Sequence, residues 1–304
     1  MKLAPRPCPL CGSTDHSRIL VESNFDPSRL NTYSFASRKI PEFMHFRMII
    51  CPDCDLCYAT PIPNLSWFHK EYIEADFDAA IESRHAAQSY AECLKKNISS
   101  LPALNGALDI GTGDGAFLGE LLNLGLTRVQ GVEPSKAPIA CADPGVTPFI
   151  RHGFFEPGMF APETFNLISC FQTIEHLPEP GDLFTSAFTM LRPGGCFFLA
   201  AHNYRSLAAK IFRGRSPIFD IEHLQLLSPR STAALYNRAG FSGVRVLHLR
   251  NRYPLSYWLR LAPLGEGLKK RVDSFFKALG LADATLSLPA GNIAAFGFKP
   301  SAAA

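Results

Sequence analysis

Four cysteines near the start of the chain have the spacing of metal ligands. Cys8 and Cys11 lie in "CPLCG", and Cys51 and Cys54 lie in "CPDCDLC". A C-x-x-C turn can place two thiolates on one metal ion, and two such turns complete a tetrahedral zinc site. A closed four-thiolate site leaves no open coordination position, so we predict a structural Zn²⁺ bound by these four cysteines.

Disulfide or redox chemistry is the alternative to zinc for these cysteines. Disulfides are uncommon in the cytosol, and a redox C-x-x-C would account for one pair only. Cys57 is a spare thiol that could replace one ligand, and Asp55 stands where glycine is common in such turns. The scattered cysteines are expected to be small buried hydrophobes: Cys93, Cys141, Cys170 and Cys196.

A second candidate site is the glycine turn in "LDIGTGDGAF", residues 108–117. Glycines without a Cβ let a ligand approach the backbone and make positive φ accessible. The helix expected after Gly115 offers free N–H groups to an anionic group. Glu133 ends the next apolar run, and its carboxylate can accept hydrogen bonds from a ribose diol. The pair predicts a ligand that has a ribose and a small polar tail.

Strands and helices alternate around these residues from position 104 onward. The alternation predicts a parallel sheet covered on both faces, with the last two strands able to pair antiparallel at an edge. A turn is expected at 192–195. The expected strands are 106–111, 128–133, 147–150, 165–172, 196–203, 243–249 and 292–299, and the expected helices are 116–125, 135–142, 181–191 and 229–239.

The glycine spacing departs from that of a dinucleotide site. The chain has G-x-G-x-G rather than G-x-G-x-x-G, with Ala116 at the third glycine position. With Asp109 two residues before Gly111, the turn resembles motif I of class I S-adenosylmethionine-dependent methyltransferases. "NLISCFQTIEHLPEP" (166–180) and "LRPGG" (191–195) resemble later motifs of that family in the same order.

This resemblance, over about residues 100–250, implies an α/β fold with a Rossmann-like, seven-stranded, mostly parallel sheet. The N-terminal zinc ribbon is similar to that of bacterial methyltransferases of sugar and secondary-metabolite pathways, in which the ribbon helps to shape the substrate side. A dinucleotide enzyme or a fold without cofactor is the alternative.

The resemblance also implies the cofactor contacts. Asp109 and the backbone of 111–115 would hold the methionine end of S-adenosylmethionine, and Glu133 would hold the ribose. Since 151–158 has no aspartate for the adenine amine, Phe154 or Phe155 is expected to sandwich the adenine. The expected cofactor-binding residues are Asp109, Gly111, Thr112, Gly113, Gly115, Glu133, Pro134, Phe154, Phe155, Phe171 and Gln172.

A hydroxyl acceptor would benefit from a general base, although alignment of the two reactants could suffice. The candidates follow expected strands: Glu175 and His176, His202 and Asn203, and Glu222 and His223. An imidazole titrates near neutral pH, so we predict His176 as the first choice and His223 as the second, with Glu175 beside them. A structural hydrogen bond is the alternative role for each histidine.

The expected organisation is a zinc ribbon at 1–63, a helical linker or lid at 64–103, and a methyltransferase domain at 104–304. A helical insert at 250–290 carries seven Lys or Arg and three Asp or Glu beside several aromatic residues. It could be a buried insert, cap the substrate pocket or lie on a membrane surface.

The chain has 304 residues, 47% of them apolar and 19% charged, as expected for a globular protein. The net charge of +3 is too small to imply nucleic-acid binding, and 1–63 has no dense basic stretch. The first residues lack the apolar segment of a secretory signal, so a cytoplasmic location is expected. We predict a small-molecule acceptor. The alternatives are an RNA methyltransferase that uses the ribbon, and a non-catalytic S-adenosylmethionine-binding module.

Overall fold

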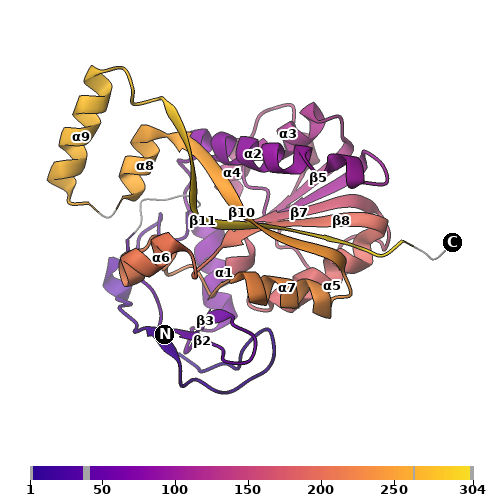
Figure 1. Cartoon of the computed structure of the whole chain (residues 1–304), viewed down its shortest axis with the longest axis horizontal. Coiled ribbons are helices and arrows are strands. Elements are labelled where there is room, and N and C mark those ends of the chain that lie inside the picture. Colours follow the sequence, from indigo (N-terminus) through magenta and orange to yellow (C-terminus); the bar gives the residue numbers. More distant parts are fainter. Residues whose placement is uncertain (1–2, 37–41, 263, 302–304) are drawn as a thin grey trace.

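The computed structural model describes residues 3–36, 42–262 and 264–301. Its centre is a seven-stranded sheet that twists through the molecule (Figure 1). The strands, in spatial order, are β10 (Ser242–Pro254), β11 (Thr285–Phe298), β8 (Leu191–His202), β7 (Phe165–Phe171), β4 (Asn105–Ile110), β5 (Thr127–Glu133) and β6 (Ile150–His152).

The pairing in this sheet is mostly parallel. The strands from β6 to β8 run parallel to one another, whereas β11 pairs antiparallel with both β8 and β10. The predicted α/β architecture and its antiparallel edge pair are therefore confirmed. The chain builds outward from β4 in both directions, through β5 on one side and β7 on the other. This reversal creates the crevice above the strand ends where ligands bind in open α/β sheets.

Helices cover both faces of the sheet (Figure 1). All seven residues of β7 are buried, which requires apolar cover above and below. One face is covered by α2 (Ala80–Lys95), α3 (Ala116–Asn123) and α4 (Lys136–Ala140), and the other by α5 (Pro180–Met190) and α7 (Pro229–Arg238).

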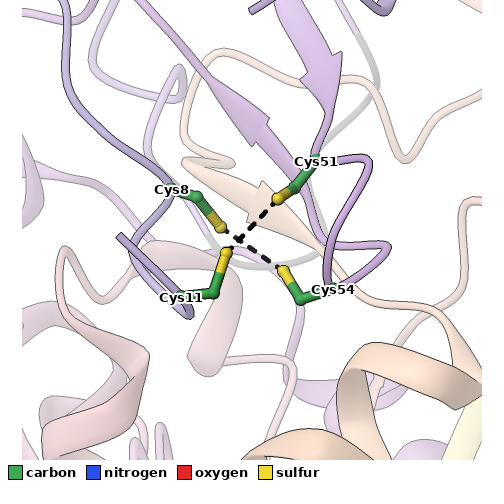
Figure 2. Close-up of side chains that lie close together, drawn as sticks. All are labelled: Cys8, Cys11, Cys51 and Cys54. Atoms are coloured by element: carbon green, nitrogen blue, oxygen red, sulfur yellow. Dashed lines mark hydrogen bonds between the residues drawn. The ribbon is translucent and has the colours of Figure 1, made fainter. Parts of the chain in front are cut away.

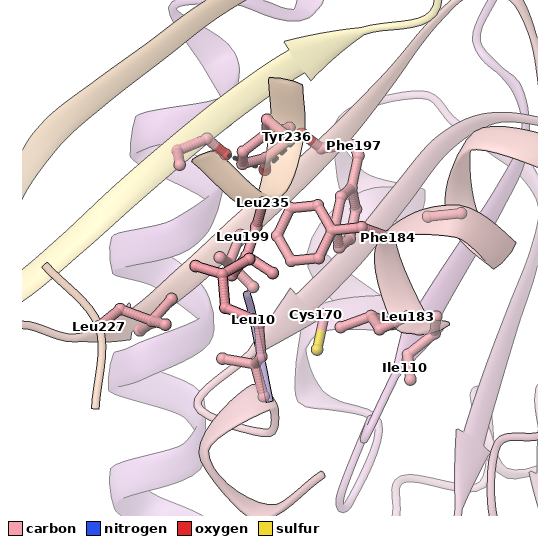
Figure 3. Packing of buried hydrophobic residues seen from close by; sticks show 14 of the residues in the cluster. Leu10, Ile110, Cys170, Leu183, Phe184, Phe197, Leu199, Leu227, Leu235 and Tyr236 are labelled. Atoms are coloured by element: carbon pink, nitrogen blue, oxygen red, sulfur yellow. Dashed lines mark hydrogen bonds between the residues drawn. The ribbon is translucent and has the colours of Figure 1, made fainter. Parts of the chain in front are cut away.

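The core on the α5–α7 side contains a fully buried tyrosine. The Tyr236 hydroxyl donates to the carbonyl oxygens of Phe197 at 3.1 Å and Ala295 at 3.0 Å, so it links α7 to two strands. The Phe184 ring packs edge-on against it with 4.8 Å between centroids (Figure 3). Leu10 reaches this same cluster, which means that the N-terminal segment shares the main core.

The N-terminal segment forms a smaller antiparallel sheet. It contains β1 (Ile19–Val21), β2 (Met48–Ile50), β3 (Cys57–Ala59) and, as its last strand, β9 (Gln225–Leu226). Cys57 of β3 pairs with Leu226 of β9. The predicted ribbon at 1–63 thus takes a strand from a segment that the sequence assigns to the other domain.

Three local predictions differ from the structure. The strand expected at 147–150 is a 3₁₀ turn followed by β6, and the turn expected at 192–195 lies within β8. The two C-terminal strands also extend into the predicted insert, where Tyr253 still pairs with Leu286. This two-stranded arm carries α8 (Leu255–Leu261) and α9 (Glu266–Ala278) away from the sheet (Figure 1).

Two further helices, α1 (Leu65–Glu74) and α6 (Leu207–Phe212), pack against the core of the smaller sheet. Asn64 caps α1 by accepting a hydrogen bond from the backbone N–H of Trp67. Within the described residues, no helix is long and apolar enough to cross a membrane.

Candidate active site and cysteine cluster

The glycine turn follows β4 at the switch point of the sheet. Gly111 has φ 75°, and a Cβ on it would lie 2.1 Å from the Thr173 side-chain oxygen, so only glycine fits here. Gly115 has φ 72° and caps α3, where a side chain would also crowd Ile150. From the sequence, we expected these glycines to allow close approach to the backbone and positive φ, and the backbone angles and short Cβ distances agree.

Glu133 points directly at this turn. Its two carboxylate oxygens accept hydrogen bonds from the backbone N–H groups of Gly113 and Ser135, each at 2.9 Å. Burial raises the pKa of Glu133 to about 7. A carboxylate has about four acceptor positions, so two remain for a ligand hydroxyl pair.

Asp109, at the end of β4, is the second buried acid beside the turn. Its carboxylate accepts a hydrogen bond from the Ser169 hydroxyl at 2.6 Å, and burial raises its pKa to about 6. Two desolvated carboxyl groups side by side are stabilised in their charged form by a nearby positive charge. The turn is therefore suited to a ligand that carries both hydroxyl groups and a cationic centre.

A cavity of about 700 Å³ opens above the strand ends. Most of the predicted cofactor residues line it, namely Asp109, Gly111, Thr112, Gly113, Glu133, Pro134, Phe154, Phe171 and Gln172. Gly115 and Phe155 lie outside this lining. Gly115 holds the start of α3, and Phe155 packs against the core on the α5–α7 side.

Phe154 has a neighbour that the sequence did not indicate. The ring of His69, from α1, stacks on it with 4.4 Å between centroids and 29° between planes. Both rings line the cavity. Because the rings already touch, an adenine could stack on one outer face of the pair but could not lie between them.

Three histidines converge on the other half of the cavity. The ring centroids of His176 and His202 each lie 5.1 Å from that of His223, and all three line the cavity with Glu222. His176 and His223, together with Glu222, also have ligand atoms within 4.8 Å of one another. The predicted catalytic histidines are thus brought together from segments far apart in the sequence.

The hydrogen bonds of these histidines differ. His223 Nδ1 lies 2.8 Å from the carbonyl oxygen of Ile218, which can only accept, so Nδ1 carries the proton. His176 has its Nε2 3.0 Å from the Gln172 carbonyl oxygen and its Nδ1 2.7 Å from the Tyr72 hydroxyl. Both ring nitrogens of His176 are therefore engaged by the surrounding structure.

Glu175 is fully buried and lies outside the cavity lining. Its carboxylate accepts a hydrogen bond from the backbone N–H of His202 at 2.6 Å, and burial raises its pKa to about 7. This position supports the end of β8, which carries His202. The sequence made Glu175 a catalytic candidate; in the structure its carboxylate bonds to the backbone of β8 and does not line the cavity.

The four cysteines predicted as zinc ligands lie together (Figure 2). The Sγ atoms of Cys8 and Cys54 are 3.4 Å apart, as are those of Cys11 and Cys51, and all four lie within 4.8 Å of one another. This arrangement of four thiols suits tetrahedral coordination of Zn²⁺. Cys57 is fully buried on β3 and is not part of the cluster.

Asp55, beside this cluster, connects it to the loop after β8 and to the start of α7. It has φ 62°, the left-handed conformation for which glycine is common in such turns. Its carboxylate forms a two-pronged ion pair with Arg205, with Oδ2 2.7 Å from Nε, and accepts from the Tyr204 hydroxyl at 2.9 Å. The Ser228 hydroxyl donates to its carbonyl oxygen at 3.1 Å.

The sequence alone did not identify four residues that have clear structural roles: His69, Tyr72, Tyr204 and Arg205. Each lies on or next to a helix or loop that had no recognised motif, and each meets its partner more than 80 positions away in the chain. One signal in the sequence pointed to two of these residues, Tyr204 and Arg205. Asp55 replaces the usual glycine, and a carboxylate in a tight turn needs a hydrogen-bond or ion-pair partner.

Comparison with known proteins identifies the family. The family described as "Methyltransferase domain" matches residues 82–246. The chain is 31% identical over 131 residues to the ubiquinone biosynthesis O-methyltransferase of Pseudomonas fluorescens, and 29% identical over 134 residues to that of Burkholderia lata. Each match covers 41% of this chain and 54% of the relative, so the chain spans about half the length of these curated relatives.

A solved structure has the same fold. A chain from the complex between the Trm112 methyltransferase activator and a methyltransferase of Haloferax volcanii superposes with a TM-score of 0.50, at 14% identity. The match covers 79% of this chain and 96% of that one. The sheet, the glycine turn with Glu133, and a family match over more than half of the residues agree. The chain therefore belongs to the methyltransferase-domain family and carries a class I S-adenosylmethionine-dependent methyltransferase domain.

Proposed function

We propose that this protein transfers the methyl group of S-adenosylmethionine to a small-molecule acceptor bound in the same cavity. The observation that carries the proposal is the continuity of the cavity, which joins the glycine turn and Glu133 to the wall of three histidines. Its volume of about 700 Å³ is in the range of small-molecule sites.

The glycine turn and the two buried acids would hold the cofactor. Glu133 would accept hydrogen bonds from the ribose hydroxyls, while Asp109 and the backbone of 111–115 would face the methionine end. The outer face of the His69–Phe154 pair offers a stacking surface for the adenine. When bound, S-adenosylmethionine supplies an electrophilic methyl group on a sulfonium centre.

His223 is the best-supported general base. Its Nε2 would take the proton of an acceptor hydroxyl as the acceptor oxygen becomes methylated. The hydrogen bond from Nδ1 to Ile218 fixes the ring and its tautomer for that task. His176 was the first choice from sequence. Its contacts with Gln172 and Tyr72 instead support a role in shaping the acceptor wall.

Burial raises the pKa of Tyr72 well above its usual value, helped by the nearby carboxylates of Glu222, Asp220 and Glu175. The phenol therefore stays protonated and remains a hydrogen-bond donor in the acceptor half of the cavity. We propose that Tyr72 and His176 position the acceptor, while Glu175 holds the end of β8 in place.

The cysteine cluster would bind a structural Zn²⁺ through Cys8, Cys11, Cys51 and Cys54. The zinc would fix the two C-x-x-C turns, and Asp55 would transmit that order to the segment that carries His223. This use of zinc needs no open coordination position, in keeping with four cysteine ligands.

The names of the relatives support a small-molecule acceptor. Ubiquinone biosynthesis O-methyltransferases are similar to this chain over 41% of its length. We propose an acceptor hydroxyl on a sugar, a secondary metabolite or a lipid-linked intermediate, in line with the zinc-ribbon methyltransferases that the sequence resembles. An RNA acceptor and a purely cofactor-binding role have no specific feature of the described residues in their favour.

Calorimetry with S-adenosylhomocysteine, the demethylated product, tests the proposal directly. Saturable binding at one site per chain is expected, together with a large loss of affinity in Glu133→Ala. A folded protein that binds neither S-adenosylmethionine nor its product would overturn the proposed function.

A further inference from the structure

Helix α9 presents an apolar stripe to solvent. Leu268, Phe275 and Leu279 are 51%, 60% and 55% exposed. Because each residue advances an α-helix by about 100°, these three positions fall within an arc of about 40°. α9 has no buried residue, and it stands at the end of the C-terminal arm, away from the sheet (Figure 1).

The flank of α9 next to this stripe is the one that faces the protein. Val272 and Phe276 are partly buried on that side, and Lys269 donates from Nζ to the carbonyl oxygen of Arg260 next to α8 at 2.9 Å. The packing against α8 therefore fixes the orientation of α9. The stripe of Leu268, Phe275 and Leu279 is left on the outer surface.

The net charge of α9 is positive. α9 contains Lys269, Lys270, Arg271 and Lys277 against two acids, Glu266 and Asp273. Arg271 lies beside the stripe by helical geometry, about 60° from Leu268. A helix with an exposed apolar face and basic residues around it is suited to the interface of an anionic bilayer.

We propose that α9 docks the protein on anionic phospholipid membranes, with Leu268, Phe275 and Leu279 inserted among the acyl chains. Arg271, beside the stripe, would contact the headgroups, and Lys270, on the far side of the helix, would add longer-range attraction. This assigns a partner and specific residues to the membrane contact that the composition of 250–290 suggested.

A second copy of the chain fits this surface less well. Two α9 helices of net charge +2 would repel each other, whereas an anionic lipid surface attracts them. A stable protein interface also buries about 800 Å² per partner, more than three side chains on one helix supply.

α8, which lies beside α9, forms part of the cavity wall. Trp258 and Leu261 of α8 line the cavity, as do Leu288 and Pro289 on the neighbouring strand. Docking through α9 would bring this wall of the cavity close to the bilayer. If the proposed function holds, a lipid-linked acceptor could then enter without crossing water. Membrane docking itself does not depend on turnover.

Co-sedimentation with vesicles tests the proposal on the full chain. The wild-type protein should bind vesicles of phosphatidylcholine with phosphatidylglycerol at low salt, and bind pure phosphatidylcholine much more weakly. Leu268→Ser with Phe275→Ser should lower the partition coefficient about tenfold or more, because exposed apolar side chains lose their insertion energy. Lys270→Glu with Arg271→Glu should lower the partition coefficient by at least about fivefold for each charge changed.

Ile81→Ser is the matched control, since Ile81 is 65% exposed on α2, outside this surface. It should bind vesicles like the wild type. Fluorescence of Phe275→Trp, quenched by brominated lipids, gives a second readout of insertion that needs no loss-of-binding variant.

Absence of binding to anionic vesicles at low salt would overturn the proposal, as would equal binding by the Leu268→Ser/Phe275→Ser variant. So would a dimer that forms without vesicles and is lost in that variant. Calorimetry with S-adenosylhomocysteine on the same samples separates the two proposals. Retained cofactor binding without vesicle binding overturns the docking surface alone.

Discussion

The Asp55 carboxylate lies 2.7 Å from Arg205 Nε, which joins a turn of the cysteine cluster to the loop after β8. β9 begins only two residues after His223, and it pairs with β3 directly after the cluster. The cysteine cluster and the histidine side of the cavity are therefore parts of one connected structural unit, although they lie far apart in the sequence.

Replacing the Asp55 carboxylate should loosen this unit. In Asp55→Asn we expect a loss of about 1–3 kcal/mol in the free energy of unfolding, since a largely buried, charge-assisted hydrogen-bond pair is broken while Arg205 stays partly solvated. Urea unfolding measures it. Glu22→Gln breaks an exposed pair with Arg47 and should cost less than about 0.5 kcal/mol. Equal losses in the two variants would contradict a special role for Asp55.

The cysteine cluster should hold one zinc ion per chain. Metal analysis of the purified protein should find it, and Cys54→Ser should abolish it, because three thiols do not complete the tetrahedral site. Cys57→Ser is the matched control, since Cys57 is buried nearby but lies outside the cluster. A strong chelator should lower the unfolding temperature. Zinc retained in Cys54→Ser but lost in Cys57→Ser would require a different ligand set.

His223 and His176 should differ in their effect on turnover. His223→Gln should lower kcat by about 10²-fold or more with little change in the Kd for S-adenosylhomocysteine, since it removes the atom that takes the acceptor proton. His176→Gln should mainly raise KM for the acceptor by disturbing the contact with Tyr72. Full turnover in both variants would show that alignment alone is enough, and a larger kcat defect in His176→Gln would restore the order expected from sequence.

Cofactor affinity should depend on pH through Glu133. The pKa of this acid is raised by burial to about 7, whereas hydrogen bonds from a ribose diol favour its ionised form, so binding should release a proton near neutral pH. Affinity for S-adenosylhomocysteine should rise between about pH 6 and 8. Calorimetry in buffers of different ionisation enthalpy counts the protons, and Glu133→Gln should remove most of the release. Any remainder would be assigned to Asp109, whose pKa is raised to about 6.

The same raised pKa has a consequence for the unliganded protein. A carboxyl group whose folded pKa lies above its unfolded pKa adds stability at low pH that is lost as the pH rises. The contribution of Glu133 should therefore fall between about pH 4.5 and 7 and stay constant above that. The difference in unfolding free energy between wild type and Glu133→Gln, followed over this range, measures it. A difference that does not change with pH would contradict the raised pKa.

The sequence by itself determined the features that depend on local geometry. The glycine turn, the C-x-x-C pairs and the alternation of strands and helices each depend on residues close together in the chain. The types and spacing of those residues are therefore enough to predict them. The α/β sheet, its antiparallel edge, the cysteine cluster and the placement of Glu133 beside the turn were all predicted from such patterns.

Only the tertiary structure decided how these parts meet. The contacts of His176 with Tyr72 and of Asp55 with Arg205 join segments with no shared pattern, and that of His223 with Ile218 lies in an irregular loop, so periodicity could not reveal them. The roles proposed for the two histidines rest on these contacts, and Glu175 bonds to the end of β8 rather than lining the cavity. The exposed stripe of α9 likewise depends on which helix face packs against α8, a choice made by packing rather than by composition.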